Sequence, residues 1–277
     1  MAFYTWHVPV FFFLSGYLWS GRRTFTGEVR QRLESLGKPY LFWLVVLAAL
    51  TAVVLPATYE DPSQRLLGAL YGGAAAVQPF TTLWFVSVLL VSVLLYKAIS
   101  PLPLWVQWMV VMLGLTAGTL WGTELSATPL SDGSAIPCVT YLVAGKTARV
   151  IRPSVSKPLL VGLILLAGSA ALVISGASAP IDIKFGNYGT PGVSFAVACA
   201  ISFGLVLVMD VAFEHAPGWL SQSVTKFALA GFTVVLLHPV FLWSPTPQAG
   251  DFLSGVLVPL AIGLIALKTP LSQWVTS

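Results

Sequence analysis

Charged side chains are scarce in this chain, and their scarcity excludes an ordinary soluble protein. Only 9% of the 277 residues are Asp, Glu, Lys or Arg, whereas 57% are hydrophobic and the mean hydropathy is +0.87. A typical soluble domain carries about 25% charged residues. We therefore expect membrane lipids, and no nucleic acid, as the surroundings of this protein.

Cysteine is nearly absent as well. Cys138 and Cys199 both lie in apolar stretches, so the chain has neither a disulfide framework nor cysteines at metal-ligand spacing. It also lacks heptads, repeats of solenoid length and low-complexity linkers. These absences predict a single membrane domain over residues 1–277, with no metal and no permanently bound cofactor.

Long apolar runs are what the sequence has in abundance. A membrane-spanning helix needs about 20 mostly apolar residues, and such runs recur from end to end. We predict an all-α, polytopic membrane bundle of about nine transmembrane helices. The expected spans are residues 3–20, 39–55, 80–96, 102–121, 134–148, 158–177, 191–209, 226–243 and 252–267. The span at 134–148 is the weakest, and the short stretch Leu66 to Phe80 has two open interpretations, an interfacial or re-entrant segment and a tenth span.

The distribution of Lys and Arg orients these spans. If the first span ends in the cytoplasm, twelve of the fourteen basic residues lie on that side, all but Arg65 and Lys184. Basic residues in short loops favour the cytoplasmic side. We therefore predict a multi-pass protein of the cell (inner) membrane, with the N-terminus outside and the C-terminus cytoplasmic.

The first span begins without a basic region typical of a signal peptide, because Met1–Trp6 carries no Lys or Arg. An N-terminus placed outside so close to a span leads us to expect a further helix upstream. With it the protein would have ten spans. A start codon placed too far downstream and a genuine truncation are both open explanations.

A motif in the first span leads to a family. His7–Leu18 reads HVPVFFFLSGYL, and a basic loop and Lys38–Trp43, KPYLFW, follow it. This pattern resembles the acyltransferase-3 family of bacterial membrane O-acyltransferases, which includes fucose 4-O-acetylase-like enzymes. Weaker matches follow in the same order: LWFV at 83–86, Ile136–Pro137 through Gly145, GNYG at 186–189, and LHP at 237–239. The resemblance covers nearly the whole chain.

The resemblance implies an enzyme that transfers acyl groups other than amino-acyl groups. The acyl group, usually acetyl, would pass from cytoplasmic acyl-CoA to a hydroxyl of a sugar or cell-surface polysaccharide. It also implies that the principal catalytic His of complete members lies in the first helix, which this chain lacks.

His7 is the candidate catalytic residue within this chain. A neutral imidazole at the outer edge of a span can accept a hydroxyl proton. An interfacial His that caps a helix end is the alternative. Ser15 has no base at readable spacing, so Ser15-Gly16 indicates close helix packing instead.

Basic residues on the predicted cytoplasmic side are candidates for binding the phosphates of CoA. Guanidinium and ammonium groups suit phosphate contacts, although positive-inside loops alone would produce the same pattern. The candidates are Arg22, Arg23, Arg30, Arg32, Lys146 and Arg149.

On the predicted outer side, four residues are candidates for binding the acceptor substrate: Trp84, Asn187, Tyr188 and His238. Trp84 could instead belong to an aromatic belt. His238 precedes Pro239, whose missing N–H leaves a backbone carbonyl one turn earlier without a helix partner. An ionisable residue inside a span is a functional candidate, with helix-to-helix hydrogen bonding as the alternative.

Two other functions remain open from the sequence. A lipid or sugar-lipid transporter fits the number of spans and the Gly and Pro interruptions, but it should show repeat-related halves. An inactive, truncated fragment is the other alternative.

Overall fold

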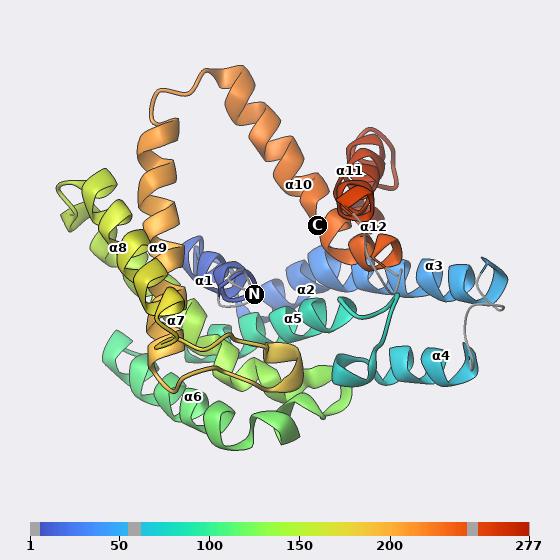
Figure 1. Cartoon of the computed structure of the whole chain (residues 1–277), viewed down its shortest axis with the longest axis horizontal. Helices are drawn as coiled ribbons and strands as arrows, with labels where there is room; N and C mark the ends of the chain where they lie inside the picture. Colours follow the sequence, from blue (N-terminus) through green and yellow to red (C-terminus); the bar gives the residue numbers. More distant parts are fainter. Residues whose placement is uncertain (1–5, 55–61, 243–248, 277) are drawn as a thin grey trace. The chain divides into compact units, whose positions relative to one another are not determined.

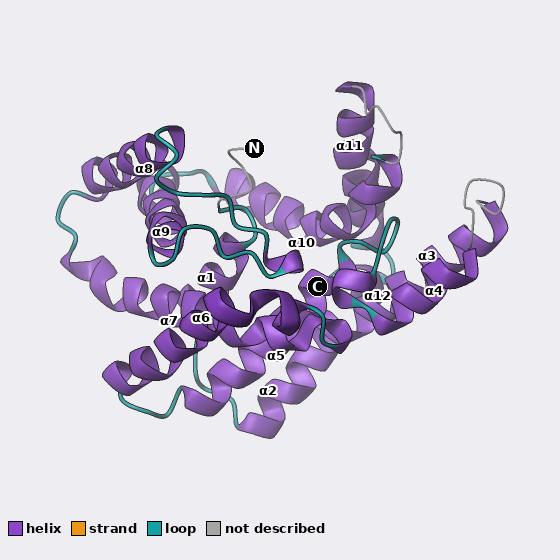
Figure 2. Ribbon diagram, turned by 60° about the horizontal axis from the view of Figure 1, so that its bottom comes forward, coloured by secondary structure: helices purple, strands orange, loops and turns teal. Residues whose placement is uncertain are grey.

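The structure is a computed structural model that describes residues 6–54, 62–242 and 249–276. These residues form helices and connecting loops, without a β-strand among them (Figure 2). They fall into two compact units. Unit 1 comprises residues 1–28, 91–128 and 132–216, and unit 2 comprises 29–90, 129–131 and 217–277. Each unit is described by itself.

Unit 1 is built from five complete helices: α1 (Pro9–Tyr17), α6 (Leu104–Ser126), α7 (Ala135–Ile151), α8 (Pro158–Ile174) and α9 (Val193–Phe213). Short 3-10 turns connect them at Arg152–Ser154 and Ile183–Phe185, and a further 3-10 segment, Pro129–Ser134, precedes α7. The helix pair α8 and α9 lies side by side in Figures 1 and 2.

Unit 2 also contains five complete helices: α3 (Lys38–Val54), α4 (Pro62–Tyr71), α10 (Gly218–Phe241), α11 (Ala249–Ala266) and α12 (Ser272–Val275). A π-helical turn, Leu33–Gly37, leads into α3, and a 3-10 turn, Gly73–Ala75, follows α4. The boundary between the units falls within two further helices, α2 (Phe25–Arg32) and α5 (Leu83–Ile99).

Each of the nine expected spans coincides with a helix, although several ends differ. α1 has only nine residues, which is shorter than the expected span 3–20, because Pro9 begins the helix and Leu18 ends it. Residues 1–5 lie outside the described part. α10 begins at Gly218, eight residues before the expected 226, directly after Pro217. Proline commonly stands at a helix start because it needs no N–H partner there.

Four of the described helical segments are long and apolar enough to cross a membrane, and three shorter apolar helices accompany them. The four are residues 25–53, 104–126, 193–213 and 218–241. A membrane protein is therefore supported, whereas the full count of about nine spans, their orientation and the single-domain organisation stay predictions.

Helices α1 and α7 approach each other at backbone distance. A Cβ on Gly16 would overlap the Leu142 carbonyl, and a Cβ on Gly145 would overlap the Phe13 carbonyl. Only glycine fits at either position, as expected for small-residue packing between membrane helices. This confirms the packing role predicted for Gly16. The neighbouring Ser15 hydroxyl donates to the Phe11 carbonyl at 2.8 Å within the same helix.

Aromatic side chains complete the core of unit 1 around α7. Phe13, Ala144 and Ala148 form a buried cluster against which Trp108 packs. The Trp108 indole N–H donates to the Thr147 hydroxyl at 3.0 Å. The Trp108 indole of α6 therefore packs its apolar ring into the core, and its N–H is satisfied by Thr147 of α7.

In unit 2, the C-terminal segment is tied to two long helices. The Val275 carbonyl accepts hydrogen bonds from the Trp43 indole of α3 at 3.1 Å and from the Thr233 hydroxyl of α10 at 3.3 Å. The Lys38 ammonium lies 5.7 Å from the ring centre of Trp274. These contacts place α12 beside α3 and α10.

Candidate active site

A cleft of about 440 Å³ lies in unit 1 where the ends of several helices meet. We call it the lysine cleft. Its lining residues are Trp19, Ser20, Gly21, Tyr96, Lys97, Ser100, Pro101, Leu104, Gln107, Lys146 and Val150. They come from the segment after α1, the last turn of α5, the start of α6 and the second half of α7. Two ammonium groups in one concave site give it the charge needed to bind an anion.

Lys97 is one of the two lysines that line the lysine cleft. Its ammonium donates to the Arg23 carbonyl at 2.6 Å and lies 5.9 Å from the ring centre of Trp19. Trp19 in turn meets Tyr96 edge to face, with ring centres 5.0 Å apart. An ammonium above an aromatic face is stabilised by the ring quadrupole, so the Trp19 ring, itself packed against Tyr96, helps to position the Lys97 ammonium.

Gln107 is a further polar residue that lines the cleft. Its amide nitrogen donates to the Ser100 carbonyl at 3.2 Å and to the Leu102 carbonyl at 2.7 Å. These two bonds fix which end of the amide is the nitrogen. The other end, Oε1, is buried and has no hydrogen-bond partner among the described residues. A buried acceptor without a partner is costly, so this oxygen lowers the stability of the fold unless a buried water satisfies it.

The six predicted donor-binding residues divide between the two units. Lys146 lines the lysine cleft. Arg149, one turn later on α7, donates to the Trp19 carbonyl at 2.9 Å and to the Tyr17 carbonyl at 3.3 Å, so it holds the end of α1. Arg22 is exposed in the same connection. Arg23 is paired with the buried Glu28 at 3.6 Å.

The other two predicted donor-binding residues, Arg30 and Arg32, lie in unit 2. Arg30 is largely exposed and forms an ion pair with Glu34 at 3.1 Å, one helical turn away. Arg32 ends α2. The structure thus brings Lys146 into a cleft, gives Arg149 and Arg23 contacts with the chain itself, and leaves all six roles as predictions.

Sequence reasoning missed Lys97, Trp19 and Gln107 as cleft residues. Lys97 had been assigned only to a side of the membrane. Gln107 is a lone amide in an otherwise apolar run, which was a usable signal because a buried amide needs partners. Trp19 carried no signal in the sequence beyond its aromatic ring.

The loop before α9 carries Asn187 and Tyr188. Asn187 is exposed, and its side-chain oxygen accepts from the Gly189 backbone N–H at 2.8 Å. Its backbone pairs with Asp182 through two hydrogen bonds of 2.7 and 2.9 Å. Tyr188 is only 5% exposed, so its ring packs inside unit 1.

The hydroxyl of Tyr188 lies in a buried polar region. Burial raises the pKa of Tyr188 well above its usual value, and the nearby Ser134 hydroxyl partly offsets that rise. Neither hydroxyl has a partner of good hydrogen-bond geometry among the described residues. In the same loop, burial lowers the pKa of Lys184 to about 8, against the opposing effect of Asp182.

In unit 2, the other two predicted acceptor-binding residues lie on α5 and α10. Trp84 is 7% exposed and meets Phe85 edge to face at 6.4 Å. The Thr82 hydroxyl, just before α5, donates to the Leu236 carbonyl of α10 at 3.3 Å. The start of α5 therefore contacts α10 one turn before its end, two residues from His238.

His7 lies in the turn directly ahead of α1 and is half-buried. The turn closes through a hydrogen bond of 3.0 Å from the Val10 N–H to the Trp6 carbonyl. The catalytic role of His7 stays a prediction. No cluster of three or more potential metal ligands is present among the described residues.

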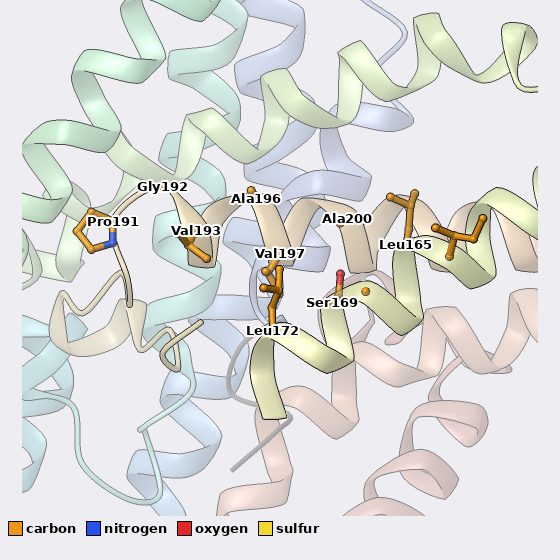
Figure 3. Close-up of a pocket in the computed structure, with 11 residues that line it drawn as sticks. Leu165, Ser169, Leu172, Pro191, Gly192, Val193, Ala196, Val197 and Ala200 are labelled. Carbon is orange, nitrogen blue, oxygen red and sulfur yellow. The ribbon is translucent and has the colours of Figure 1, made fainter. Parts of the chain in front are cut away.

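A second hollow of unit 1, between α8 and α9, has a different chemistry (Figure 3). Its volume is about 580 Å³, and aliphatic side chains such as Leu165, Leu172 and Val197 point toward it. Ser169 contributes a lone polar side chain beside them, and no charged residue lines it. This apolar groove lacks the groups that acyl transfer requires, so the lysine cleft is the stronger candidate site.

Comparison with known families identifies the chain. The model of the acyltransferase-3 family, described as an acyltransferase domain, matches residues 1–268. No curated protein and no solved structure matches the chain. The match covers nearly all of the sequence, including every residue that lines the lysine cleft, and the helices are apolar enough for a membrane. The resemblance of the HVPVFFFLSGYL motif is therefore confirmed, and the chain belongs to the acyltransferase-3 family of membrane acyltransferases.

Proposed function

We propose that this protein is an O-acyltransferase that takes an acyl group, most simply acetyl, from acyl-CoA and places it on a hydroxyl of a sugar or surface polysaccharide. The observation that carries the proposal is the lysine cleft, where Lys97 and Lys146 line one concave site together with Trp19 and Gln107. Acyl-CoA offers phosphates for the two ammonium groups.

The physical argument for a phosphate ligand rests on charge and geometry. The two lysines belong to α5 and α7, so tertiary packing brings them together. Charge-assisted hydrogen bonds to phosphate are about twice as strong as neutral ones.

In this proposal the lysine cleft faces the cytoplasm, where acyl-CoA is made, and the basic connections around Arg22, Arg30 and Arg149 share that side. The residues proposed for the acceptor lie toward the outer face: His7 as the candidate base, with Trp84, Asn187, Tyr188 and His238. Acyl-CoA acts as a co-substrate in this scheme and is not permanently bound.

The direct test measures acyl transfer. The full-length protein encoded by the gene would be purified in lipid nanodiscs and mixed with radiolabelled acetyl-CoA and a chemically de-O-acetylated surface polysaccharide. We expect label to appear on the polysaccharide as an alkali-labile ester, with release of free CoA thiol. If neither acyl transfer nor saturable CoA binding is observed, the proposal is overturned.

Paired variants assign the donor site. In Lys97→Gln/Lys146→Gln, loss of two charge-assisted contacts should weaken CoA binding by at least tenfold, since such bonds contribute about 1.5–3 kcal/mol each. Lys226→Gln, which changes an exposed lysine of unit 2, is the matched control. Equal CoA affinity in both variants would place the donor elsewhere.

A sugar-lipid transporter is the second candidate from the sequence. Among the described residues the apolar groove between α8 and α9 is its best support. The same nanodisc experiment separates the two functions, because a transporter forms no covalent ester on the polysaccharide.

A further inference from the structure

Helices α8 and α9 of unit 1 pack closely at one place and leave a groove at another. A Cβ on Gly162 of α8 would lie 3.0 Å from the Gly204 carbonyl oxygen of α9, and the reverse distance is also 3.0 Å. Nearer to the connection between the two helices, a Cβ on Gly168 or Gly192 would meet nothing within 4 Å. The open space there is the apolar groove of Figure 3.

The groove has the size of a ligand site and almost wholly apolar walls. Its volume of about 580 Å³ falls within the range of about 300–1,000 Å³ that is typical of ligand pockets. Ten of its eleven lining residues are Gly, Ala, Pro, Val, Leu or Ile, and none is charged. Because apolar cavities do not hold water stably, the groove favours a hydrocarbon occupant.

The surroundings of α8 supply such an occupant. Beside the groove, Leu163 and Ile164 are 50% and 61% exposed, and only Gly162 and Ser169 of this helix are buried. The expected span 158–177 contains the whole of α8. In a membrane protein an exposed apolar helix face contacts lipid, so lipid chains are the apolar molecules next to the groove.

Ser169 is the exception among the lining residues, because it carries a hydroxyl. Its side chain points from α8 into the space between the two helices (Figure 3), and the residue is only 3% exposed. Ser202 of α9 donates to the Ala198 carbonyl at 2.7 Å, four residues earlier in its own helix. The Ser169 hydroxyl has no hydrogen-bond partner in the described part of the chain, and a buried donor without a partner is costly.

The depth of Ser169 indicates which acceptor a lipid offers it. Ser169 stands five residues before Ile174, the last residue of α8, which corresponds to about 7.5 Å along the helix. The interfacial layer on each side of the hydrocarbon core is about 5–8 Å thick. Ser169 therefore lies near the level at which the fatty-acid esters of a phospholipid meet the hydrocarbon, and the carbonyl oxygen of each ester is an acceptor.

We propose that the apolar groove binds one acyl chain of a membrane glycerophospholipid, and that the Ser169 hydroxyl donates a hydrogen bond to the ester carbonyl of that chain. A helix of a second copy is the competing occupant, but its backbone carbonyls are already bonded within the helix. An ester carbonyl in hydrocarbon has no partner of its own. Since no charged residue lines the groove, the charge of the lipid headgroup should not affect binding. The site is independent of the proposed acyl transfer.

Photolabelling locates the lipid. The full-length protein would be reconstituted in phosphatidylcholine vesicles with a trace of phosphatidylcholine that carries a diazirine in one acyl chain, and labelled peptides would be identified by mass spectrometry. We expect labelling to concentrate on the groove-lining segments 164–172 and 191–200. Replacing the vesicle lipid and the probe by the phosphatidylglycerol equivalents should leave this pattern unchanged.

A groove-filling variant tests the site itself. Gly168 stands one turn after Ile164 and one turn before Leu172, which also line the groove, so Gly168→Phe places a ring in it. Labelling of both segments should fall by at least about tenfold, since each methylene displaced is equivalent to about fourfold in affinity. Leu160→Phe, at a 53% exposed position of α8 outside the groove, is the matched control. Monodisperse elution of both variants shows that they fold.

A lipid without ester carbonyls tests the role of Ser169. A diacyl probe should label the groove about fivefold more in vesicles of dialkyl ether phosphatidylcholine than in diacyl vesicles, because the ether host cannot compete for the Ser169 hydrogen bond. In Ser169→Ala, which removes only the hydroxyl, labelling should be equal in the two hosts. An equal result in wild type, or the same preference in Ser169→Ala, would overturn the assignment of the ester contact.

Two other outcomes count against the groove as a lipid site. Labelling spread evenly over the exposed face of α8, or unchanged in Gly168→Phe, would show that the chain contacts only ordinary surrounding lipid. Disulfide-linked dimers of an Ala196→Cys variant in these vesicles, beyond those of the wild type, would show that a second copy occupies the groove. Either result would overturn the inference and leave the proposed acyl transfer unaffected.

Discussion

Helices α7 and α8 have 17 residues each and follow one another in the chain, yet they occupy opposite environments. Eleven residues of α7 are buried, whereas only Gly162 and Ser169 of α8 are. α8 is the more apolar helix and α7 the weakest of the predicted spans. In a membrane, lipid tails are as apolar as leucine, so apolarity marks contact with lipid, and burial inside the protein accompanies small and polar residues.

The largest expected effect comes from filling the contact between α1 and α7. Gly145→Val would drive side-chain atoms into the Phe13 carbonyl, and because this overlap is with backbone, the two helices would have to move apart to relieve it. We expect loss of monodisperse protein in fluorescence-detected size-exclusion chromatography. Gly168→Val on α8 is the matched control, because a Cβ there meets nothing within 4 Å. Equal yields of both variants would contradict the contrast between these helices.

A leucine pair tests the same contrast by removing atoms. Leu142 of α7 is fully buried, and Leu163 of α8 is 50% exposed. Leu142→Ala should leave a cavity and lower the free energy of unfolding by about 2–5 kcal/mol, whereas Leu163→Ala should cost less than about 0.5 kcal/mol, as for surface positions. Reversible unfolding in mixed micelles measures both. A larger loss for Leu163→Ala than for Leu142→Ala would contradict the difference in burial between the two helices.

The third pair compares lysines of the two helices in donor binding. Lys146 of α7 lines the lysine cleft, and Lys157 is the exposed residue that precedes α8. Lys146→Gln should weaken CoA binding by about tenfold, because one charge-assisted contact is lost. Lys157→Gln should leave the affinity within about twofold, since exposed charges are screened. Titration calorimetry measures the CoA affinity of each variant, and repeating it at a second salt concentration measures how strongly salt screens each charge.

The positions of the helices followed from the sequence because long apolar runs have one stable form in lipid, the helix. Their degree of burial did not follow. α7 reads as a weak span since it carries residues such as Thr140 and Thr147, but these hydroxyls bond the Val111 and Val143 carbonyls inside the protein. Hydropathy counts such residues against a span, although packing against other helices favours them.

The candidate site was predictable where one chain segment defines it. The His238-Pro239 pair predicted an open carbonyl, and the contact of 3.0 Å between His238 Nδ1 and the Val235 carbonyl oxygen, four residues before Pro239, confirms it. Lys146 was found through its basic connection. Lys97 and Gln107 come from helices other than that of Lys146, so only tertiary packing places them in one cleft. Tyr188 was a candidate for binding the acceptor, and tertiary contacts that the sequence does not show bury its ring.

The smallest expected effect concerns the connection between α8 and α9, which contains a largely buried lysine, Lys184. Burial lowers its pKa to about 8 from 10.5, and the Asp182 carboxylate opposes the shift. Between about pH 8 and 10.5 the unfolded chain holds a proton that the folded chain has released. The free energy of unfolding therefore rises with pH across this window, and below pH 8 the cost of burying the ammonium is fully present.

Tyrosines and cysteines also titrate in that window, so the wild type must be compared with Lys184→Met, which keeps an unbranched side chain and removes the charge. We expect the stability difference, wild type minus variant, to increase between pH 8 and 10.5 and to be flat from pH 6 to 7.5. Thermal unfolding followed at each pH gives this difference. A stability difference that does not change with pH would mean that Lys184 reaches solvent in the folded protein. The connection after α8 would then be as exposed as α8.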